Sequence, residues 1–412
     1  MNYKKTKLTC YFTYLATASI FALPPMLFMV FRQMYGISFT LLGTLVLINF
    51  CTQLLIDLIF SFFSKHFNIH TTLKVTPLLT SLGLAVYAII PTVFPQYAYA
   101  GLVAGTVLFS ISAGLCEVLL SPTVAALPSD TPEKDMTTLH SLYGYGVVSV
   151  VVISSVFLKI FGTESWTYLT LLWAILPLIS CALFCSCDLP PMALSQPAAV
   201  KKKTAGKTWL YLCVVCIFLG GASENVMTNW ISTYLENVLG IEKATGDILG
   251  LCLFAILLSV SRSLYAKFGK KIYPVLLCGM ASAAVCYITA GLSPTPALSL
   301  IACVLTGACT SMLWPGTLIL MEDHYPQAGV TAYALMAAGG DLGSSVAPQL
   351  LGIVVDKVTA SSWAIALSQS IGASPEQIGI RTGMLISTAF PVCGILLLLV
   401  MHRYLRSKKS CV

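Results

Sequence analysis

Long apolar runs separated by short polar stretches fill this chain from end to end. Most runs hold about 20 residues, the length that an α-helix needs to cross a hydrocarbon core of roughly 30 Å. Six runs come first, at residues 8–31, 41–63, 73–94, 97–120, 139–161 and 166–184. Six more follow, at residues 209–234, 248–264, 272–292, 298–320, 330–355 and 384–401. The pattern predicts an all-α integral membrane protein with 12 transmembrane helices.

A polar stretch rich in proline and lysine separates the two sets of six runs. It contains Asp188, Pro190, Pro191 and Pro197 together with four lysines, a composition typical of a linker. We therefore expect an N-terminal six-helix bundle at residues 1–187, a cytoplasmic linker at 188–207 and a C-terminal six-helix bundle at 208–412. The segment from Asp356 to Arg381 is unusually polar, and we expect it to lie outside, partly as a surface helix at 363–367.

The basic residues predict the orientation of the chain in the membrane. Apolar residues make up 57% of the sequence and charged residues only 9%. With an even number of spans and the N-terminus inside, 18 of the 23 Lys and Arg residues fall on the cytoplasmic face, as the positive-inside rule requires. Both termini are therefore expected in the cytoplasm, and the net charge of +7 reflects orientation rather than a nucleic-acid partner.

The two halves of the chain share an internal repeat. Residues 114–122 of the fourth span match residues 307–315 of the tenth, with Gly, Cys, Leu and Pro at the same places. Residues 18–37 of the first span match 222–241 of the seventh in one unbroken register, from Ala-Ser to Gly-Ile. Internal repeats are a recognised architecture of transporters, so we interpret the shared positions as scaffold.

With this repeat the chain resembles the major facilitator superfamily, whose members carry two six-helix bundles around a central cavity. Within that superfamily, the segment around Glu117 and the sequence from Gly221 to Glu224, followed by Trp230, look like the fucose permease and sugar:proton symporter branch. The resemblance implies that Glu117 belongs to the substrate and proton site. The acid that this branch places in its first helix has no counterpart here, because that span carries no charged residue between Lys7 and Arg32.

Three acidic residues lie deep inside apolar runs. An ionised side chain in hydrocarbon costs at least about 2.5 kcal/mol and normally faces a bundle interior or a water-filled path. By the repeat, Glu117 matches Thr310 and Glu224 matches Ile20, so the common scaffold requires neither acid and both are functional candidates. Asp341 is flanked by glycines that permit close helix packing, and either a functional site or a structural ion pair fits it.

Other polar and aromatic residues complete the candidate site. Asn49, Gln53 and Asp57 recur every four residues and share one face of the second span, suited either to line a cavity or to bond neighbouring helices. The further substrate or proton candidates are Asn225, Asn229, Trp230, His140 and Tyr143. Asp57, Arg262 and Lys267, nearer the cytoplasmic face, are expected to be gating or structural residues, and Arg262 is expected to snorkel or to pair with a cytoplasmic acid.

The cysteines indicate packing rather than chemistry. Most of the 15 lie within apolar runs, where free Cys behaves as a small hydrophobe. Cys213 and Cys216 have a C-x-x-C spacing but no second pair, so we expect neither a metal site nor a disulfide. We also expect no cofactor, and we expect protons to be the coupling ion.

These observations predict a secondary active transporter and not an enzyme. The hypothesis is proton-coupled symport of a small polar solute, a sugar, by alternating access in a plasma membrane, of the bacterial inner-membrane kind, with a monomeric protein. A proton-coupled exporter of drugs or metabolites remains an alternative, although the fifth span lacks the Gly-Pro pair expected of it. A non-transporting sensor or scaffold is a second alternative, but it would be expected to carry a large soluble domain.

Overall fold

The fold of this protein is helical throughout its described residues. The computed structural model describes residues 3–63, 66–130, 132–190, 207–269, 271–325 and 330–409, and no strand occurs in these ranges. Ten helical stretches are long and apolar enough to cross a membrane, or up to 12 if each of two bent pairs is one span. The expected all-α architecture of 12 spans is thereby confirmed, while the cytoplasmic position of the termini stays a prediction.

The chain divides into two compact units. Unit 1 comprises Met1–Ile37 and Ile48–Pro197, and unit 2 comprises Ser38–Leu47 and Ala198–Val412. The first three turns of the second span therefore pack with the C-terminal unit. Residues 191–206, which make up most of the expected linker, lie outside the described part of the chain, so the expected linker limits of 188 and 207 stay a prediction.

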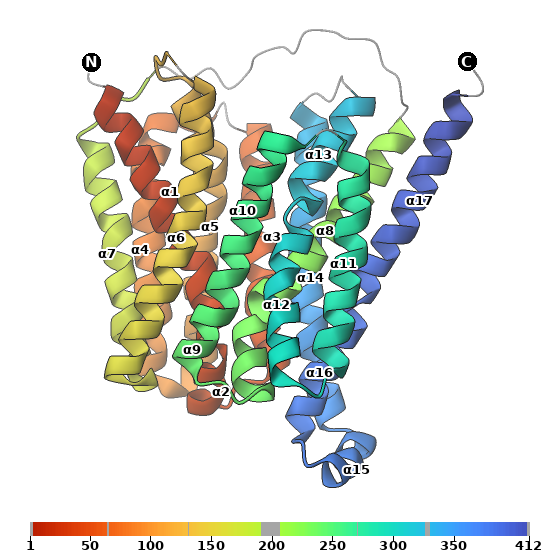
Figure 1. The fold of residues 1–412 in the computed structure, drawn as a ribbon. Coiled ribbons are helices and arrows are strands. Elements are labelled where there is room, and N and C mark those ends of the chain that lie inside the picture. The colour runs from red at the N-terminus through yellow and green to blue at the C-terminus, as the bar shows by residue number, and fades with distance from the viewer. Residues whose placement is uncertain are drawn as a thin grey trace. The chain divides into compact units, whose positions relative to one another are not determined.

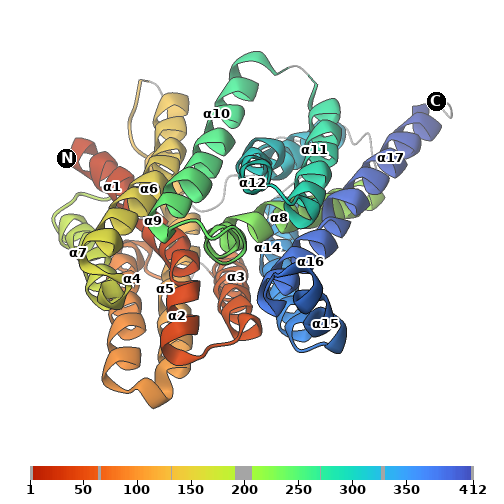
Figure 2. The same ribbon diagram turned by 60° about the horizontal axis from the view of Figure 1, so that its bottom comes forward.

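Unit 1 is built from helices that follow the predicted spans (Figures 1 and 2). They are α1 (Tyr3–Met26), α2 (Phe28–Tyr35), α3 (Phe39–Phe63, from Ile48 onwards), α4 (Ile69–Val93), α5 (Ala98–Ala125), α6 (Pro132–Phe161) and α7 (Trp166–Cys185), with short 3₁₀ turns η2 (Pro95–Tyr97) and η3 (Thr163–Ser165). The first span bends by 49° between α1 and α2. Pro24 and Pro25 at the end of α1 explain the bend, because proline cannot donate the backbone hydrogen bond of a helix.

Unit 2 contains the start of α3 and all helices from α8 onwards. They are α8 (Lys207–Thr233), α9 (Lys243–Asp247), α10 (Leu253–Phe268), α11 (Ile272–Leu292), α12 (Pro296–Thr310), α13 (Leu313–His324), α14 (Val330–Thr359), α15 (Ser362–Ile371), α16 (Pro375–Ser387) and α17 (Ala389–Lys409). Two π-helical turns, η4 (Tyr234–Val238) and η5 (Ile248–Cys252), extend α8 and precede α10. The expected surface helix is present as α15, which turns away from α14 by 76°.

The structure supports the internal repeat at the level of single glycines. Gly36 and Gly240, which match in sequence, both have a left-handed backbone with φ of 64° and 65°, a conformation that strongly favours glycine. A Cβ on Gly114 of α5 would lie 3.1 Å from the Gln53 carbonyl oxygen of α3. A Cβ on the matching Gly307 of α12 would lie 2.3 Å from the carbonyl oxygen of Phe254 in α10. In each half, this glycine allows the fourth transmembrane span to pack closely against the second span of the same half. The shared positions are therefore scaffold.

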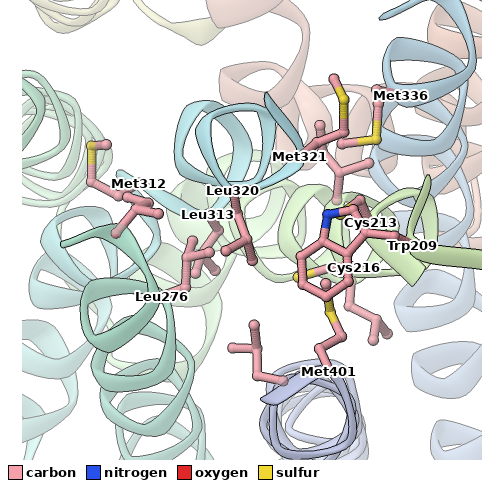
Figure 3. Close-up of a cluster of buried hydrophobic side chains, with 14 of the residues drawn as sticks. Trp209, Cys213, Cys216, Leu276, Met312, Leu313, Leu320, Met321, Met336 and Met401 are labelled. Atoms are coloured by element: carbon pink, nitrogen blue, oxygen red, sulfur yellow. The ribbon is translucent and has the colours of Figure 1, made fainter. Parts of the chain in front are cut away.

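A cluster of buried apolar side chains lies in unit 2 (Figure 3). Trp209, Cys213 and Cys216 of α8 contribute to it together with Leu313 of α13 and Met401 of α17. Both cysteines are fully buried, and the Cys216 thiol lies 3.7 Å from the Thr317 hydroxyl. This environment fits the packing role that was expected for the C-x-x-C pair.

Candidate functional site

A polar contact joins α3 to α5 in unit 1. The Ser110 hydroxyl of α5 donates a hydrogen bond to Oδ1 of Asn49 (2.7 Å), and Nε2 of Gln53 donates to the same oxygen (2.9 Å). All three side chains are buried. Of the two roles left open by the sequence, Asn49 shows the bonding of a neighbouring helix, whereas Gln53 hydrogen-bonds to Asn49 within α3. Buried polar groups need such partners.

Asp57 continues this polar face of α3. Its Oδ1 atom would lie 3.1 Å from a Cβ on Gly114, so the glycine makes room for the half-buried carboxylate. Asp57 thereby packs at the contact of α3 with α5, which agrees with a structural role. Glu117 lies three residues beyond Gly114, nearly one helical turn further along α5.

Glu117 is exposed in the middle of a transmembrane helix. Within the described residues its carboxylate has neither a hydrogen bond nor an ion pair, and the residue is exposed, whereas its neighbours Cys116 and Leu119 are buried. Tyr14 of α1 lies close enough for an electrostatic interaction with this carboxylate. An acid at mid-span without such a partner among the described residues is costly in hydrocarbon. A packing role within the described part of the chain therefore does not account for Glu117.

Tyr14 belongs to a row of half-buried aromatic rings. The ring centroids of Tyr14 and Tyr143 are 6.0 Å apart in an edge-on arrangement, and Phe21 lies 5.9 Å from Tyr143 and 6.3 Å from Phe50. The structure thus brings the predicted residue Tyr143 into the same region as Glu117, with Tyr14 between them. His140 belongs to α6, but its side chain lies outside the described part of the chain.

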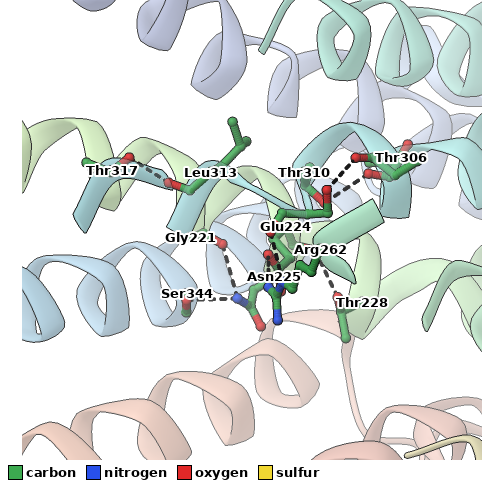
Figure 4. A network of polar contacts seen from close by, with 12 residues as sticks. Gly221, Glu224, Asn225, Thr228, Arg262, Thr306, Thr310, Leu313, Thr317 and Ser344 are labelled. Carbon is green, nitrogen blue, oxygen red and sulfur yellow. Dashed lines mark hydrogen bonds and ion pairs between the residues drawn. The ribbon is translucent and has the colours of Figure 1, made fainter. Parts of the chain in front are cut away.

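In unit 2, Glu224 of α8 forms an ion pair with Arg262 of α10 (Figure 4). Nη2 of Arg262 lies 3.3 and 3.4 Å from the two carboxylate oxygens. These distances are slightly longer than those of a typical charge-assisted hydrogen bond. The Glu224 side chain is 18% exposed and that of Arg262 is 40% exposed, so the pair is accessible rather than sealed in a core.

A break in the tenth span anchors the same arginine. Nε of Arg262 donates a hydrogen bond to the Ser311 carbonyl oxygen (2.8 Å), and Ser311 lies between α12 and α13. Pro315, four residues later, has no N–H group to donate to that carbonyl. The arginine therefore satisfies a backbone group that the proline leaves open, and this bond orients its guanidinium toward Glu224.

This pairing corrects one expectation. Arg262 was expected to snorkel or to pair with a cytoplasmic acid, but its partner is the intramembrane acid Glu224. The position near the end of a span was the only sequence signal, and it does not reveal how α8 and α10 pack. Lys267 is exposed and lies over the ring of Phe268, 5.2 Å from its centroid, which is compatible with the structural role expected for it.

Other polar residues of α8 form hydrogen bonds to α14 or within α8 itself. Nδ2 of Asn225 donates to the Ser344 hydroxyl (2.8 Å), and Nδ2 of Asn229 donates to the Asn225 carbonyl oxygen (2.9 Å). Trp230 is fully buried and its indole N–H donates to the Pro348 carbonyl oxygen (3.1 Å). Trp230 thus packs against α14 in this structure, and its assignment to the substrate site stays a prediction.

Asp341 lies in a glycine-lined contact between α8 and α14. A Cβ on Gly343 would lie 2.0 Å from the Phe218 carbonyl oxygen, and a Cβ on Gly221 would lie 2.6 Å from that of Gly340. The expected close helix approach is thus present. Asp341 itself is half-buried, and its assignment to the substrate site stays a prediction.

Several charged residues with clear structural contacts were not singled out in the sequence. Lys243 lies within 3.5 Å of carboxylate oxygens of both Glu236 and Asp247. The carboxylate of Asp356 in α14 accepts hydrogen bonds from the backbone N–H groups of Phe39 (3.1 Å) and Thr40 (2.6 Å) at the start of α3. The spacing of four residues between Lys243 and Asp247 was a sequence signal for their ion pair. The Asp356 contact joins residues 317 positions apart, so the sequence contains no signal for it.

Among the residues that the structure describes, no group of three or more His, Cys, Asp or Glu side chains is placed to hold a metal ion.

Two helical units with repeated glycines at the same helix contacts are typical of a polytopic membrane protein with an internal repeat. The sequence model of the Major Facilitator Superfamily matches residues 8–348. The chain belongs to this superfamily, and it is therefore a transporter rather than an enzyme. No curated protein matches the sequence.

Solved structures of this superfamily share the fold at low sequence identity. A bacterial homologue of the human lysosomal transporter Spinster, in an inward-facing and occupied conformation, gives a TM-score of 0.75 at 14% identity over 97% of this chain and 96% of that chain. A D-xylose-proton symporter gives 0.73 at 14% identity over 95% and 97%. The fucose:proton symporter of E. coli gives 0.55 at 13% identity over 96% and 99%. At these identities the likeness shows the fold alone.

Proposed function

We propose that this transporter carries a small polar solute, a sugar, across the plasma membrane by proton-coupled symport with alternating access. The observation that carries the proposal is the exposed carboxylate of Glu117 in the middle of a transmembrane helix. This carboxylate has no hydrogen-bond or ion-pair partner among the described residues. An acid at mid-span is costly while it is ionised and much less so while it is neutral. Such a group can take up a proton on one side of the membrane and release it on the other, so that no net charge crosses on the side chain.

The surroundings of Glu117 suit a sugar. Tyr14 and Tyr143 offer flat apolar faces with polar edges, and such rings pack against the apolar face of a sugar while hydroxyl groups exchange hydrogen bonds. Phe21 and Phe50 extend this surface without adding charge. A ligand with several hydroxyl groups would find both an acceptor in the Glu117 carboxylate and an aromatic platform.

Glu224 and Arg262 provide a second charged element. Protonation of Glu224 would remove the charge that attracts Nη2 of Arg262, whereas the bond from Nε to the Ser311 carbonyl does not depend on that charge. The guanidinium would then be free to form other hydrogen bonds. In the proposal, Glu117 is the main proton carrier, and the Glu224–Arg262 pair is a second group, within unit 2, that responds to protonation.

Transporters of similar structure support the substrate class. They include a D-xylose-proton symporter, a fucose:proton symporter and a nucleoside transporter. Xylose, fucose and nucleosides are small polar molecules that contain a sugar ring. This common chemistry agrees with the aromatic and carboxylate groups around Glu117.

The substrate class is tested by thermal stabilisation of the purified protein. A ligand that binds only the folded state raises the unfolding temperature. A panel of sugars, nucleosides and hydrophobic cations would be measured at two pH values. Stabilisation by a sugar that depends on pH is the expected result, and stabilisation by hydrophobic cations alone would favour an exporter instead.

The role of Glu117 is tested in proteoliposomes with the stabilising solute. In the Glu117→Gln variant we expect uptake driven by a proton gradient to be lost, while exchange of labelled for unlabelled solute continues, because the glutamine keeps the shape but cannot release a proton. Glu164→Gln is the matched control, since Glu164 is an exposed acid in η3. Gradient-driven uptake that survives in Glu117→Gln would rule out the proposed role.

A further inference from the structure

The far end of α8 carries a second charged cluster that the proposed function does not use. Helix α8 ends in the π-helical turn η4, and the next span begins with α9 and the π-helical turn η5. Single π-helical turns are rare and frequently occur at functional sites. Glu236 lies in η4, twelve residues after Glu224 and thus roughly 18 Å further along the helix. Figure 1 shows α9 at the end of its span opposite to the Phe268 end of α10.

One lysine serves two carboxylates in this cluster. Nζ of Lys243 lies 3.5 Å from Oε2 of Glu236 and 3.4 Å from Oδ2 of Asp247, and it donates a hydrogen bond to the Ser232 hydroxyl (3.3 Å). That hydroxyl in turn donates to Oδ1 of Asp247. The four side chains therefore form one connected group at the junction of α8 and α9.

The group is withdrawn from solvent and incompletely hydrogen-bonded. The side chain of Asp247 is 1% exposed, that of Lys243 10% and that of Glu236 22%. Neither Oδ2 of Asp247 nor Oε2 of Glu236 accepts a hydrogen bond in the described structure, although both point at the ammonium group. Each of these two oxygens therefore has the shared ammonium group as its ion-pair partner but no hydrogen bond of its own, an arrangement that is costly at a buried carboxylate.

The charges of the cluster do not balance. Two ionised carboxylates and one ammonium group leave one negative charge, and two acids that share a site resist simultaneous ionisation. The charged groups of neighbouring elements form hydrogen bonds with residues outside the cluster. On α16, Arg381 donates to the Ser293 carbonyl oxygen (2.6 Å) and Glu376 accepts from Asn237 (3.4 Å). In the loop before α9, Glu242 accepts from Thr245 (2.9 Å). Helices α11 and α12 contain no Asp, Glu, Lys or Arg.

We propose that Glu236 and Asp247, bridged by Lys243, form a second proton site, which binds and releases one proton shared by the two carboxylates. When the proton is absent, the cluster carries one negative charge. When it is bound, one carboxylic acid can hydrogen-bond the other acid or Ser232, and the remaining carboxylate pairs with Lys243. The place of this proton in the transport cycle rests on the proposed function, since the predicted topology puts this end of α8 at the outer face.

The proton itself is tested by infrared difference spectroscopy of the full-length protein in liposomes at two pH values. The wild type should show the carbonyl-stretch band of one protonated carboxylic acid that appears as the pH is lowered. Asp247→Asn and Glu236→Gln should each lose this band, because the remaining acid pairs with Lys243 as a carboxylate. Either variant suffices if the other does not fold, and Glu242→Gln, which changes a neighbouring acid outside the cluster, should keep the band.

The result that overturns the proton site is a pH-difference spectrum that both cluster variants leave unchanged. Measurement of the reversal potential of solute flux separates this proposal from the proposed function. If solute flux in the wild type is coupled to protons, each cluster variant should move one proton fewer per solute than the wild type does. A wild-type flux that does not respond to a proton gradient would remove the symport proposal, while the infrared band would still decide the proton site.

Discussion

Replacement of Arg262 is expected to destabilise the C-terminal unit more than replacement of its partner Glu224. The guanidinium makes two different contacts, with the Glu224 carboxylate at 3.3 Å and with the Ser311 carbonyl oxygen at 2.8 Å. In Arg262→Met both are lost, and the carbonyl that Pro315 leaves open has no donor. In Glu224→Gln only the charge interaction is lost.

The magnitude follows from the distances and the exposure. Two unit charges 3.3 Å apart attract each other by about 5 kcal/mol at an effective dielectric constant of about 20 and by about 1 kcal/mol in water. Because the arginine side chain is 40% exposed, solvent screening brings the coupling to about 1–2 kcal/mol. The unsatisfied carbonyl adds about 1–3 kcal/mol. We therefore expect Arg262→Met to cost about 2–5 kcal/mol and Glu224→Gln about 1–2 kcal/mol.

A double-mutant cycle measures the coupling directly. The free energy of unfolding would be measured in mixed micelles by titration with a denaturing detergent, for the wild type, both single variants and Glu224→Gln/Arg262→Met. The double variant should be no less stable than Arg262→Met alone, since the carboxylate has already lost its partner. Arg262→Lys is the matched control that keeps the charge but loses the planar fork of donors. If the two single effects add to within about 0.5 kcal/mol, the reasoning about the pair is refuted.

Three further predictions concern stability. Asp356→Ala should lower the stability of the purified protein by about 0.5–2 kcal/mol in thermal unfolding, because the first two N–H groups of α3 lose their acceptor, whereas Asp356→Asn should cost less; equal stability of all three proteins would contradict this cap. Gly343→Ala should cost about 1–3 kcal/mol through overpacking against Phe218, while Gly246→Ala, whose nearest neighbouring atom would lie at 3.4 Å, should be tolerated; the reverse order would contradict the close contact of α8 with α14. The Lys7 ammonium, which hydrogen-bonds to Asp135, holds the pKa of that carboxyl below its usual value. This contribution to stability is present above about pH 4, the unfolded value, and is lost as the pH falls through the lower folded value. Asp135→Asn should therefore be less stable than the wild type at pH 6, with a difference that shrinks below about pH 4, and a difference independent of pH would contradict the assignment.

The fold was predictable because its main determinants are local in sequence. Each span reveals itself by its length and apolar composition, and the repeat of glycines between the halves marks where helices touch. Gly36 and Gly240 are an example, since their shared left-handed backbone could be anticipated from the matching sequences alone. The helix breaks at Leu27 and Ser311 were missed, because the hydropathy of a span does not change where its hydrogen bonds are interrupted.

The candidate site was predictable only in part. Glu117 and Glu224 were identifiable because an acid inside an apolar run is conspicuous. The partner of Glu224 was not identifiable, since Arg262 lies 38 residues away and its orientation depends on the break between α12 and α13. Lys243, Glu236 and Asp247 escaped notice because charges near the end of a span are ordinary in sequence, and only the packing of η4 on α9 reveals that they are buried together.

The central claim is that a proton gradient drives solute uptake by this protein. It is tested most directly by solute uptake into liposomes that contain the purified wild type, with the outside made acidic or kept at the internal pH. The account predicts accumulation above the external concentration only when the outside is acidic. Equal uptake with and without the proton gradient would contradict it.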